Sequence, residues 1–297
     1  MNDTNAAQLY LDNLSSGHSR RSMEGALNRV AECLGHESYL DVDWPKLNYA
    51  MVMNVRSKLI KQYKPATANR MLSALRQTIQ FTWKLGQMDA ETCHRISAIK
   101  RVTYTRDLMG RYIEDGEMQR LCQVCINEKT NAGIRDLAIF NVLRYAGLRR
   151  SEVIQLDVGD FDAEQRSLHV RLGKGRQVRF IPIPSRAVMT LQAWLEVRGG
   201  GPNDPLFIPI LKSGAIVERR PSDQMVLLMI RSRAAQANIT DIRPHDFRRT
   251  YISSLFDKGV DISTIMQMAG HDKPEQTVQY DRRKDIPKRR AADLFDE

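Results

Sequence analysis

The sequence predicts a mainly α-helical protein in two parts, a small helical domain followed by a larger α+β domain with one β-hairpin. Apolar residues recur at helical spacing through most of the 297 residues. Alternation typical of strands is clear on either side of a turn that contains two glycines, Gly173 and Gly175. The chain is also long enough for two domains that each bury a core.

Residues 1–100 are expected to form the helical domain. Its helices are expected at Asn5–Leu14, Ser19–Leu34, Tyr49–Tyr63 and Pro65–Leu85. Gly35 and Gly86 are typical helix stops, and Thr67 is a candidate cap for the fourth helix. Periodicity is weak from Ile96 to Gly110, so we place a linker at residues 101–112.

Residues 113–297 are expected to form the second domain, which opens with a cap signature at Asp115. Its first helices are expected at Met118–Ile126, Ile134–Ala146, Ser151–Leu156, Ser185–Val197 and Ser222–Ala237. Two strands, Ser167–Leu172 and Val178–Ile183, should pair as the hairpin, with Pro182 and Pro184 ending the second strand. Beyond them, one helix should begin near His245 and another should end at Gly270.

The charge balance points to an anionic partner. The net charge is +10 and the pI is about 9.6, which favours nucleic acid, although a merely basic surface is the alternative. From Trp44 to Met88 there are eight basic residues and no acidic one. Solvated helix faces usually mix both signs, so this stretch is a candidate DNA contact. The residues expected to make that contact are Lys58, Lys61, Arg70 and Arg76.

The cysteine pattern argues against disulfides and against zinc. Four cysteines are too few and too scattered for a disulfide framework. Cys122 and Cys125 form a lone CxxC, which reads as part of a buried helix face because no second ligand pair accompanies it. We therefore expect no zinc site. The N-terminus lacks the features of a signal peptide and no segment is long enough to span a membrane, so a cytoplasmic protein is expected.

A cluster of phosphate-friendly residues lies between Arg243 and Arg283. His245 and Arg248 should project from the first turns of one helix, and His271 follows the stop glycine of another. Tyr280 comes nine residues later, in what reads as a charged loop. Phosphate chemistry needs donors that match oxyanions, a proton acceptor and a nucleophile, and this cluster contains all three.

Three upstream residues are candidates for the rest of the site. Arg149 follows a glycine turn, and Glu152 one turn later could hold its guanidinium in a fixed fork. Lys174 lies at the hairpin tip between glycines that allow the backbone close to a ligand. Taken singly, Arg149 reads as a solvated helix residue and the Gly-Lys-Gly run as an ordinary turn.

Together these motifs resemble the tyrosine recombinases, also called the phage integrase family, and in particular its Xer-like site-specific members. The resemblance covers Asp115 to Tyr280 and rests on segments that occur in the family's order. These segments are AGLRRSEVIQLDVGDF at 146–161, RLGKGRQVRFIPIP at 171–184 and PHDFRRTYISSLFDKGVDISTIMQMAGHDKPEQTVQY at 244–280. The N-terminal domain fits the family's DNA-clamping domain in character only.

The resemblance implies a role for each candidate residue. Tyr280 would attack a scissile phosphate to form a 3′-phosphotyrosine, and Lys174 would protonate the leaving oxygen. No metal and no cofactor would be needed, because the phosphotyrosine bond conserves the energy of the broken phosphodiester. Arg149 and Arg248 would hold the non-bridging oxygens, with Glu152 orienting the site. Two further residues would assist, His245 as proton acceptor or phosphate donor and His271 as phosphate donor.

The resemblance also implies partners. These are double-stranded DNA with specific recombination sites and three further copies of the chain in a tetramer on that DNA, the free protein being a monomer. In the family the C-terminal tail, here Asp281–Glu297, packs on a neighbouring protomer. One position departs from the family's usual His-x-x-Arg-His, because Arg249 stands where the last histidine is common. This leaves room for altered local packing or an extra backbone contact.

Three other functions share parts of this pattern. A type IB-like topoisomerase uses a similar residue set, but the small helical N-terminal domain and the overall length favour the recombinase. A non-catalytic DNA-binding relative would be expected to lack Tyr280 or one of the arginines, and both are present. A phosphatase-like enzyme would not explain Lys174, Tyr280 and the acid-free basic stretch together.

Overall fold

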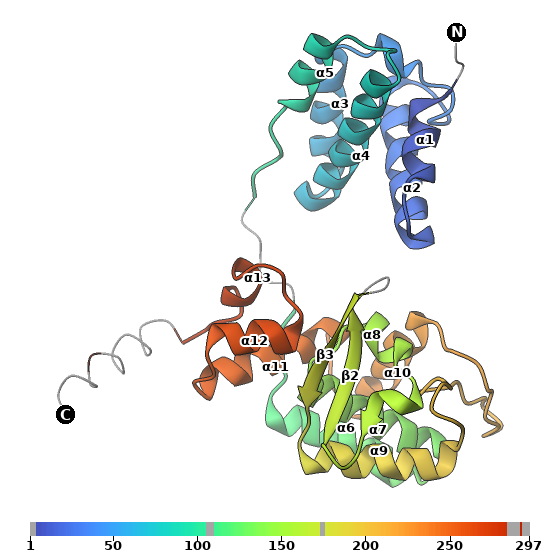
Figure 1. The fold of residues 1–297 in the computed structure, drawn as a ribbon, viewed down its shortest axis with the longest axis vertical. Helices are drawn as coiled ribbons and strands as arrows, with labels where there is room; N and C mark the ends of the chain where they lie inside the picture. Colours follow the sequence, from blue (N-terminus) through green and yellow to red (C-terminus); the bar gives the residue numbers. More distant parts are fainter. Residues whose placement is uncertain (1–3, 105–109, 173–175, 284–291, 293–297) are drawn as a thin grey trace. The chain divides into compact units, whose positions relative to one another are not determined.

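The computed structural model describes residues 4–104, 110–172, 176–283 and 292 (Figure 1), without the side chains of His18, Leu172, Arg176 and Gln177. The chain divides into two compact units, an N-terminal unit at Met1–Arg106 and a C-terminal unit at Asp107–Glu297. The described residues are mainly helical, with one small antiparallel sheet. The predicted fold class is therefore confirmed.

The N-terminal unit is a bundle built around its longest helix, α4. Its elements are α1 (Ala6–Asp12), α2 (Gly17–Leu34), η1 (Trp44–Lys46), α3 (Tyr49–Gln62), α4 (Pro65–Lys84) and α5 (Ala90–Ser97). Helix α4 packs against all the other helices of the unit (Figure 1). Its buried stripe includes Leu72, Leu75 and Ile79, which join one core with Leu27 of α2 and Leu59 of α3.

Two details of this unit differ from the sequence expectation. Helix α4 begins at Pro65, as expected, but its N-cap residue is Lys64 and not Thr67, because proline fits the first helical position, where no N–H is needed. Helix α5 was not predicted. Asp89 caps it by accepting the N–H of Thr92, and it buries Cys93 and Ile96.

The C-terminal unit is organised around α7 (Figure 1), which packs against α6, α9 and α11. Its helices are α6 (Asp115–Glu128), α7 (Asn131–Ala146), α8 (Arg150–Gln155), η2 (Val158–Asp160), α9 (Ser185–Arg198), α10 (Asp223–Gln236), α11 (Pro244–Asp257), α12 (Ile262–Ala269) and α13 (Glu275–Val278). Helix α7 is buried on most of its faces, as expected of the central helix of a core. Phe140 of α7 stacks on Phe247 of α11 with ring centroids 5.6 Å apart, so these two helices are closely packed.

The sheet has the order β1-β2-β3 and is antiparallel throughout. Its strands are β1 (Phe161–Asp162), which was not predicted, β2 (Ser167–Leu172) and β3 (Arg176–Pro182). Pro182 pairs with Ser167, so β3 ends at that proline as expected. Along β3, Arg179 and Ile181 are buried, whereas Val178 and Phe180 are exposed. A charged residue therefore occupies an inward position of this strand.

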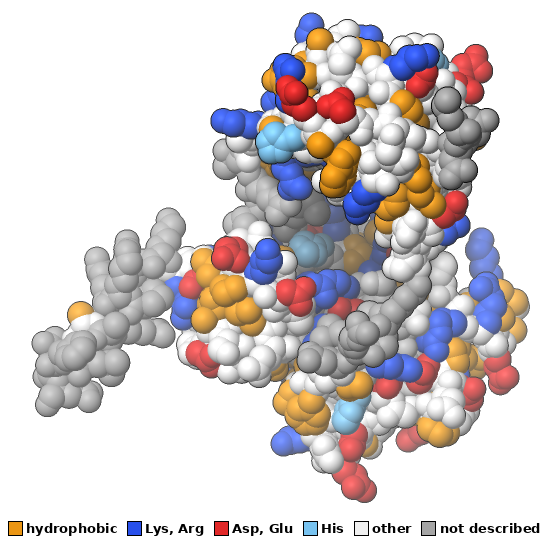
Figure 2. Space-filling model, turned by 45° about the horizontal axis from the view of Figure 1, so that its top comes forward, with side chains coloured by type: hydrophobic (Ala, Val, Ile, Leu, Met, Phe, Trp, Pro, Cys, Tyr) orange, Lys and Arg blue, Asp and Glu red, His pale blue; other side chains and the backbone are white. Residues whose placement is uncertain are grey.

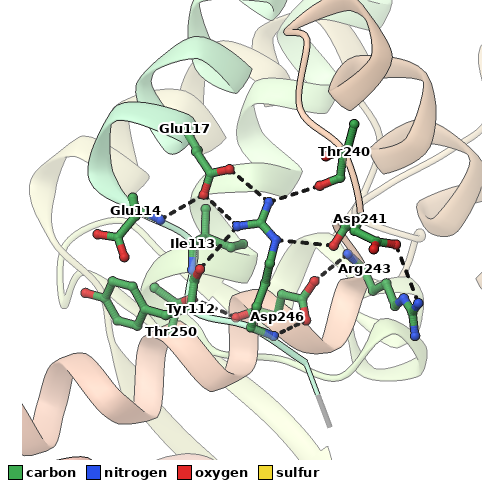
Figure 3. A network of polar contacts seen from close by, with 10 residues as sticks. Tyr112, Ile113, Glu114, Glu117, Thr240, Asp241, Arg243, Asp246 and Thr250 are labelled. Carbon is green, nitrogen blue, oxygen red and sulfur yellow. Dashed lines mark hydrogen bonds and ion pairs between the residues drawn. The ribbon is translucent and has the colours of Figure 1, made fainter.

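The start of the C-terminal unit is fastened to α6 and α11 (Figure 3). The Arg111 guanidinium makes two hydrogen bonds to Glu117, at 2.7 and 2.9 Å. The Arg111 backbone N–H donates to Asp246 at the beginning of α11 (2.9 Å). Helix α6 is capped by Glu114, whose own N–H donates to Glu117, so Asp115 is the first helical residue and the expected cap lay one position too late.

The two cysteines of the CxxC motif lie on α6, Cys125 buried and Cys122 half-buried. Burial raises the pKa of Cys122 to about 11 and that of Cys125 to about 12, which keeps both as thiols at neutral pH. In the part of the chain that the structure describes, no three His, Cys, Asp or Glu residues are grouped so as to hold a metal ion. Nor is any described helix long and apolar enough to cross a membrane.

Candidate active site

The candidate site is assembled around the first turns of α11. Pro244 occupies the first turn of this helix, and the Arg243 N–H donates to Asp246 Oδ2 (2.7 Å). This arrangement fixes where the helix begins and therefore where His245 and Arg248 lie. As expected, both residues project from its first turns.

Tyr280 lies against His245. Its hydroxyl is 3.0 Å from His245 Nε2, and the residue is only 7% exposed. It follows α13 and packs in a small apolar cluster with Phe256 of α11 and Ile265 of α12. Ser253 donates to the Tyr280 carbonyl oxygen (2.9 Å), which fixes the backbone as well. Tyr280, which the sequence placed in a charged loop, is therefore well packed in the structure.

His271 lies beside the ring of Tyr280. Gly270 ends α12 in the left-handed conformation, with φ +66°, and so turns the chain toward His271. The His271 ring stacks nearly parallel to that of Tyr280, with centroids 6.1 Å apart and planes 14° apart. Its Nδ1 is 2.7 Å from Thr277 Oγ1, which orients the ring. The other ring nitrogen, Nε2, is then available to a ligand.

Arg248 is a buried cation. It is 1% exposed, and its two terminal nitrogens donate to the Gly147 carbonyl (2.9 Å) and the Ala269 carbonyl (2.6 Å). No described carboxylate lies within 4.0 Å of it. Burial, and then the charge of Arg149, lower its pKa to about 10. A buried guanidinium without an ion-pair partner is a favourable place for an anionic ligand.

Gly147 supplies one of those carbonyls because it ends α7 in the left-handed conformation, with φ +60°. A Cβ at this position would lie 2.2 Å from the ring of Tyr251. Only glycine suits both the backbone angle and the close approach of that ring.

Arg149 is the N-cap residue of α8 and the most accessible cation described in the site, with 44% of its side chain exposed. Its Nη1 donates to Glu152 Oε1 and its backbone N–H donates to Glu152 Oε2, both at 2.8 Å. A longer contact, 3.5 Å, joins Nη2 to the Gly270 carbonyl. Glu152 thus holds Arg149 as expected, although through one side-chain nitrogen and the backbone.

The bidentate partner of Glu152 is Arg179 of β3, which the sequence motifs did not identify. Its Nη2 donates to Glu152 Oε2 (2.8 Å) and its Nη1 to Oε1 (3.3 Å). Lys174, the predicted lysine at the hairpin tip, lies outside the described residues. The structure therefore brings together five of the six residues expected to be catalytic, with Glu152, and adds Arg179.

The electrostatics of the site keep its histidines neutral. Burial, then the charges of Arg248 and Arg149, lower the pKa of His271 to about 4. Burial also lowers the pKa of His245 and raises that of Tyr280, whereas Arg248 acts to lower both. At neutral pH a neutral His245 can accept the phenol proton in the tautomer that leaves Nε2 unprotonated. An uncharged base beside a tyrosine and two arginines suits attack on a phosphate.

The four basic residues proposed from the N-terminal unit differ in their surroundings. Lys61 and Arg70 are exposed. Lys58 is exposed but donates to the Cys33 carbonyl (2.8 Å), and Arg76 donates to the Ile99 carbonyl (2.6 Å). On the face seen in Figure 2, basic side chains of this unit are interspersed with acidic and apolar ones.

Arg70 also lines a groove of about 600 Å³ within the N-terminal unit. The groove runs between α2, α4 and the segment that follows α5, and Arg101 and Tyr104 contribute to the last of these walls. Asn69 fixes that segment, because its side chain accepts the Val102 N–H (2.9 Å) and donates to the Val102 carbonyl (2.8 Å). Two arginines therefore face one groove.

Curated relatives of this chain include bacterial proteins named tyrosine recombinase XerC. The chain is 27% identical to the tyrosine recombinase XerC of Pelobacter propionicus over 284 residues, covering 94% of this chain and 90% of the relative. It is 28% identical to tyrosine recombinase XerC of Haemophilus ducreyi, covering 92% of this chain and 88% of the relative.

Solved structures share the fold at lower sequence identity. The integrase of the transposon Tn1549, in complex with transposon right end DNA, matches with a TM-score of 0.71 at 15% identity, covering 97% of this chain and 98% of that one. A lambda integrase dimer bound to a COC′ core site matches with a TM-score of 0.66 at 13% identity, covering 93% of this chain and 75% of that one.

The match to a family of proteins is the most direct of these comparisons. Residues 111–285 match the sequence model described as "Phage integrase family", and this span contains every residue of the site described above. More than half of the chain is covered. The chain therefore belongs to the phage integrase family, the tyrosine recombinases.

Proposed function

We propose that this chain is a site-specific DNA recombinase that cleaves and rejoins DNA strands through a 3′-phosphotyrosine intermediate. The observation that carries the proposal is the approach of the Tyr280 hydroxyl to His245 Nε2, 3.0 Å, beside the buried Arg248. A nucleophile, a neutral base and a cation without a carboxylate partner within the described residues are what phosphoryl transfer from DNA requires.

Tyr280 is the proposed nucleophile. Its oxygen bonds to the scissile phosphorus as the bond from phosphorus to the 5′ oxygen breaks, and His245 accepts the phenol proton. The leaving 5′ oxygen takes a proton from Lys174, which we assign by its place in the family's lysine motif. The phosphotyrosine bond conserves the energy of the phosphodiester, so a second 5′ hydroxyl can reverse the reaction without a cofactor.

Arg149 and Arg248 are proposed to hold the non-bridging oxygens of the phosphate. Arg149 is half-exposed and can reach a ligand, while Arg248 supplies a buried charge that an anion would neutralise. Neutral His271 donates a hydrogen bond from Nε2 in the tautomer in which its Nδ1 accepts the hydrogen bond of the Thr277 hydroxyl. Donors placed before the reaction stabilise the charge that develops in the transition state.

We propose double-stranded DNA with specific recombination sites as the partner, bound by a homotetramer. Residues 1–100 are assigned as the core-DNA-binding domain, residues 101–112 as the linker and residues 113–297 as the catalytic domain. Lys61 and Arg70, which are exposed, are the leading DNA contacts of the first domain. Packing of the tail at Asp281–Glu297 on a neighbouring protomer and a bacterial cytoplasmic location complete the proposal.

The test is covalent capture on DNA. The purified chain is incubated with nicked duplexes that carry a randomised central segment, so that the short strand released by cleavage is lost and the adduct is trapped. Adducts are recovered under denaturing conditions, their DNA is sequenced, and the attachment residue is found by mass spectrometry. The proposal predicts a 3′-phosphate on Tyr280 and strong enrichment of one sequence. Adducts without sequence enrichment would instead indicate a topoisomerase, and absence of any adduct would contradict both.

A further inference from the structure

The carboxylate of Glu152 is shared by two arginines, and they hold it in different ways. Arg149 donates once from its side chain and once from its backbone. Arg179 donates from both terminal nitrogens, one to each carboxylate oxygen. Its side chain is 6% exposed, against 44% for Arg149. Of the two arginines, Arg179 is therefore the buried one, and its burial prevents direct contact with DNA.

Because Arg179 lies in the sheet, its ion pair with Glu152 also connects two elements of the site. Arg179 lies on β3, where it pairs with Val170 of β2, and it comes five residues after Lys174. Glu152 lies in the first turn of α8, whose N-cap residue is Arg149. The Arg179–Glu152 contact thus connects β3, the strand that follows Lys174 in the sequence, with α8, the helix that Arg149 precedes.

We propose that Arg179 is a positioning residue for DNA cleavage, holding Glu152 so that Arg149 and β3, the strand that follows Lys174 in the sequence, keep a fixed relation. The inference rests on the proposed function, in which Arg149 binds the scissile phosphate. It assigns the role to a residue that does not itself reach the DNA.

The expected effect of removing Arg179 shows why its contact with Glu152 matters. Glu152 would keep only its bonds to Arg149 and could rotate with it, since neither group has another strong partner among the described residues. The remaining contact of Arg149, to the Gly270 carbonyl, is long at 3.5 Å. A phosphate ligand misplaced by about 1 Å can cost about 100-fold in rate.

The first test compares four variants, Arg179→Gln, Arg179→Lys, Glu152→Gln and the double variant, in single-turnover cleavage of the duplex that the wild type selects. Arg179→Gln should slow adduct formation by about 10- to 100-fold with little change in DNA affinity. Arg179→Lys should recover only part of the loss, because one ammonium does not hold both carboxylate oxygens. In the double variant Arg179→Gln with Glu152→Gln, cleavage should be no slower than with Glu152→Gln alone, since both changes act through one contact.

The second test is a pH profile, which a purely structural role for Arg179 would not move. Burial would raise the pKa of Glu152, but the hydrogen bonds and charges of Arg179, and then those of Arg149, outweigh it and hold the pKa low. The other charged or titratable groups that influence or are influenced by Glu152 are Arg248 and His271. Without Arg179 the pKa of Glu152 rises, so cleavage by Arg179→Gln should fall off at a higher pH than wild-type cleavage as the solution is acidified.

The control is Arg233→Gln, which removes a similarly buried arginine of α10 that is ion-paired with Asp136 (2.8 Å) and whose hydrogen bonds go to no residue of the site. At a temperature where all variants are folded, its cleavage rate should match the wild type. Wild-type rates in Arg179→Gln, or full recovery in Arg179→Lys, would overturn the positioning role while the Tyr280 adduct of the wild type still stood. If the wild type itself formed no adduct, the proposed function would fail first.

Discussion

A guanidinium as deeply buried as that of Arg248 normally lies against a carboxylate. Here it is stabilised by two backbone carbonyls, those of Gly147 and Ala269. The carbonyls satisfy donors but do not neutralise the charge, which is why burial lowers the pKa of Arg248. A scissile phosphate would supply the missing negative charge. The free protein thus holds this site in a state that ligand binding stabilises.

The neutral state of His271 gives a prediction about acid stability. Its folded-state pKa is about 4, below the ordinary value of 6.5, so the unfolded chain binds the proton more readily than the folded chain does. This cost to folding is absent above about pH 6.5 and grows as the pH falls toward 4. His271→Gln should therefore lose less stability than the wild type between pH 7 and pH 4.5.

Urea unfolding followed by near-ultraviolet circular dichroism at the two pH values measures this difference. The control is His94→Gln, because His94 is exposed on α5, outside the site. The control should keep the acid sensitivity of the wild type. An equal loss of stability in wild type and His271→Gln would show that His271 is not held neutral by the fold.

At the scale of elements, the site depends on how helices end. Helix α7 ends at Gly147, whose carbonyl holds Arg248, and α12 ends at Gly270, which turns the chain toward His271. The ring of Tyr251 fills the space beside Gly147, where a side chain would otherwise lie. These ends, more than the helix bodies, set the relative positions of the catalytic groups.

Gly147→Ala should destabilise the protein by about 2–4 kcal/mol, the sum of a left-handed backbone angle and a collision with the Tyr251 ring. It should also slow cleavage, because relief of the collision moves the carbonyl that holds Arg248. Differential scanning calorimetry and the single-turnover assay measure the two effects.

The matched control for that change is Gly259→Ala. Gly259 also has a positive φ, +82°, but a Cβ there would meet no atom within 4 Å. The control should cost only about 1–2 kcal/mol from the backbone angle. Equal losses in the two variants would mean that the Tyr251 ring contributes nothing.

Most elements could be predicted from the sequence because their apolar spacing and stop glycines are regular. Gly35, Gly147 and Gly270 each end a helix in the left-handed conformation, as predicted. Helix α5 was missed because only Cys93 and Ile96 are buried along its eight residues, too few to show a period. Strand β1 was missed because two residues carry no detectable alternation.

The candidate site was predicted from the resemblance to a family. The prediction overlooked Arg179 and the burial of Tyr280, and each omission has a physical reason. Arg179 was overlooked because alternation in β3 is inverted: Val178 and Phe180 face solvent while the arginine faces inward. A local pattern does not reveal a buried charge whose partner, Glu152, is 27 residues away. Tyr280 read as a loop residue for a similar reason, since the helices that bury it come from elsewhere in the chain.

Arg249 stands where the family often has a histidine, and its guanidinium is held by the backbone. Its Nη1 donates to the carbonyl of Gly110 (2.8 Å), the first described residue of the C-terminal unit. With Asp246, which accepts the Arg111 N–H, it fixes the start of that unit to the first turns of α11. Of the two possibilities that the sequence allowed for Arg249, altered packing or an extra backbone contact, the structure shows the backbone contact.

At the scale of the whole molecule, the N-terminal unit is expected to contribute sequence-independent affinity for DNA. Replacing Lys61 and Arg70 with Ala should weaken binding and reduce the slope of log affinity against log salt by about 0.9 for each phosphate that is no longer neutralised. Fluorescence anisotropy over a salt series measures this slope. Arg29→Ala is the control, because Arg29 is exposed on α2 but already paired with Glu32 (2.6 Å). A slope unchanged by the double replacement would mean that these two side chains are merely solvated.

The central claim is that the single chain carries both the phosphate site and the nucleophile, and Tyr280→Phe tests it most directly. The change removes one oxygen from a packed ring, so the fold and DNA binding should be retained. Wild type and variant are compared on the selected nicked duplex, with binding followed by anisotropy and adducts by denaturing electrophoresis. The account predicts equal binding and a complete loss of the covalent adduct in Tyr280→Phe. An adduct of undiminished yield in the variant would show that another residue attacks the DNA.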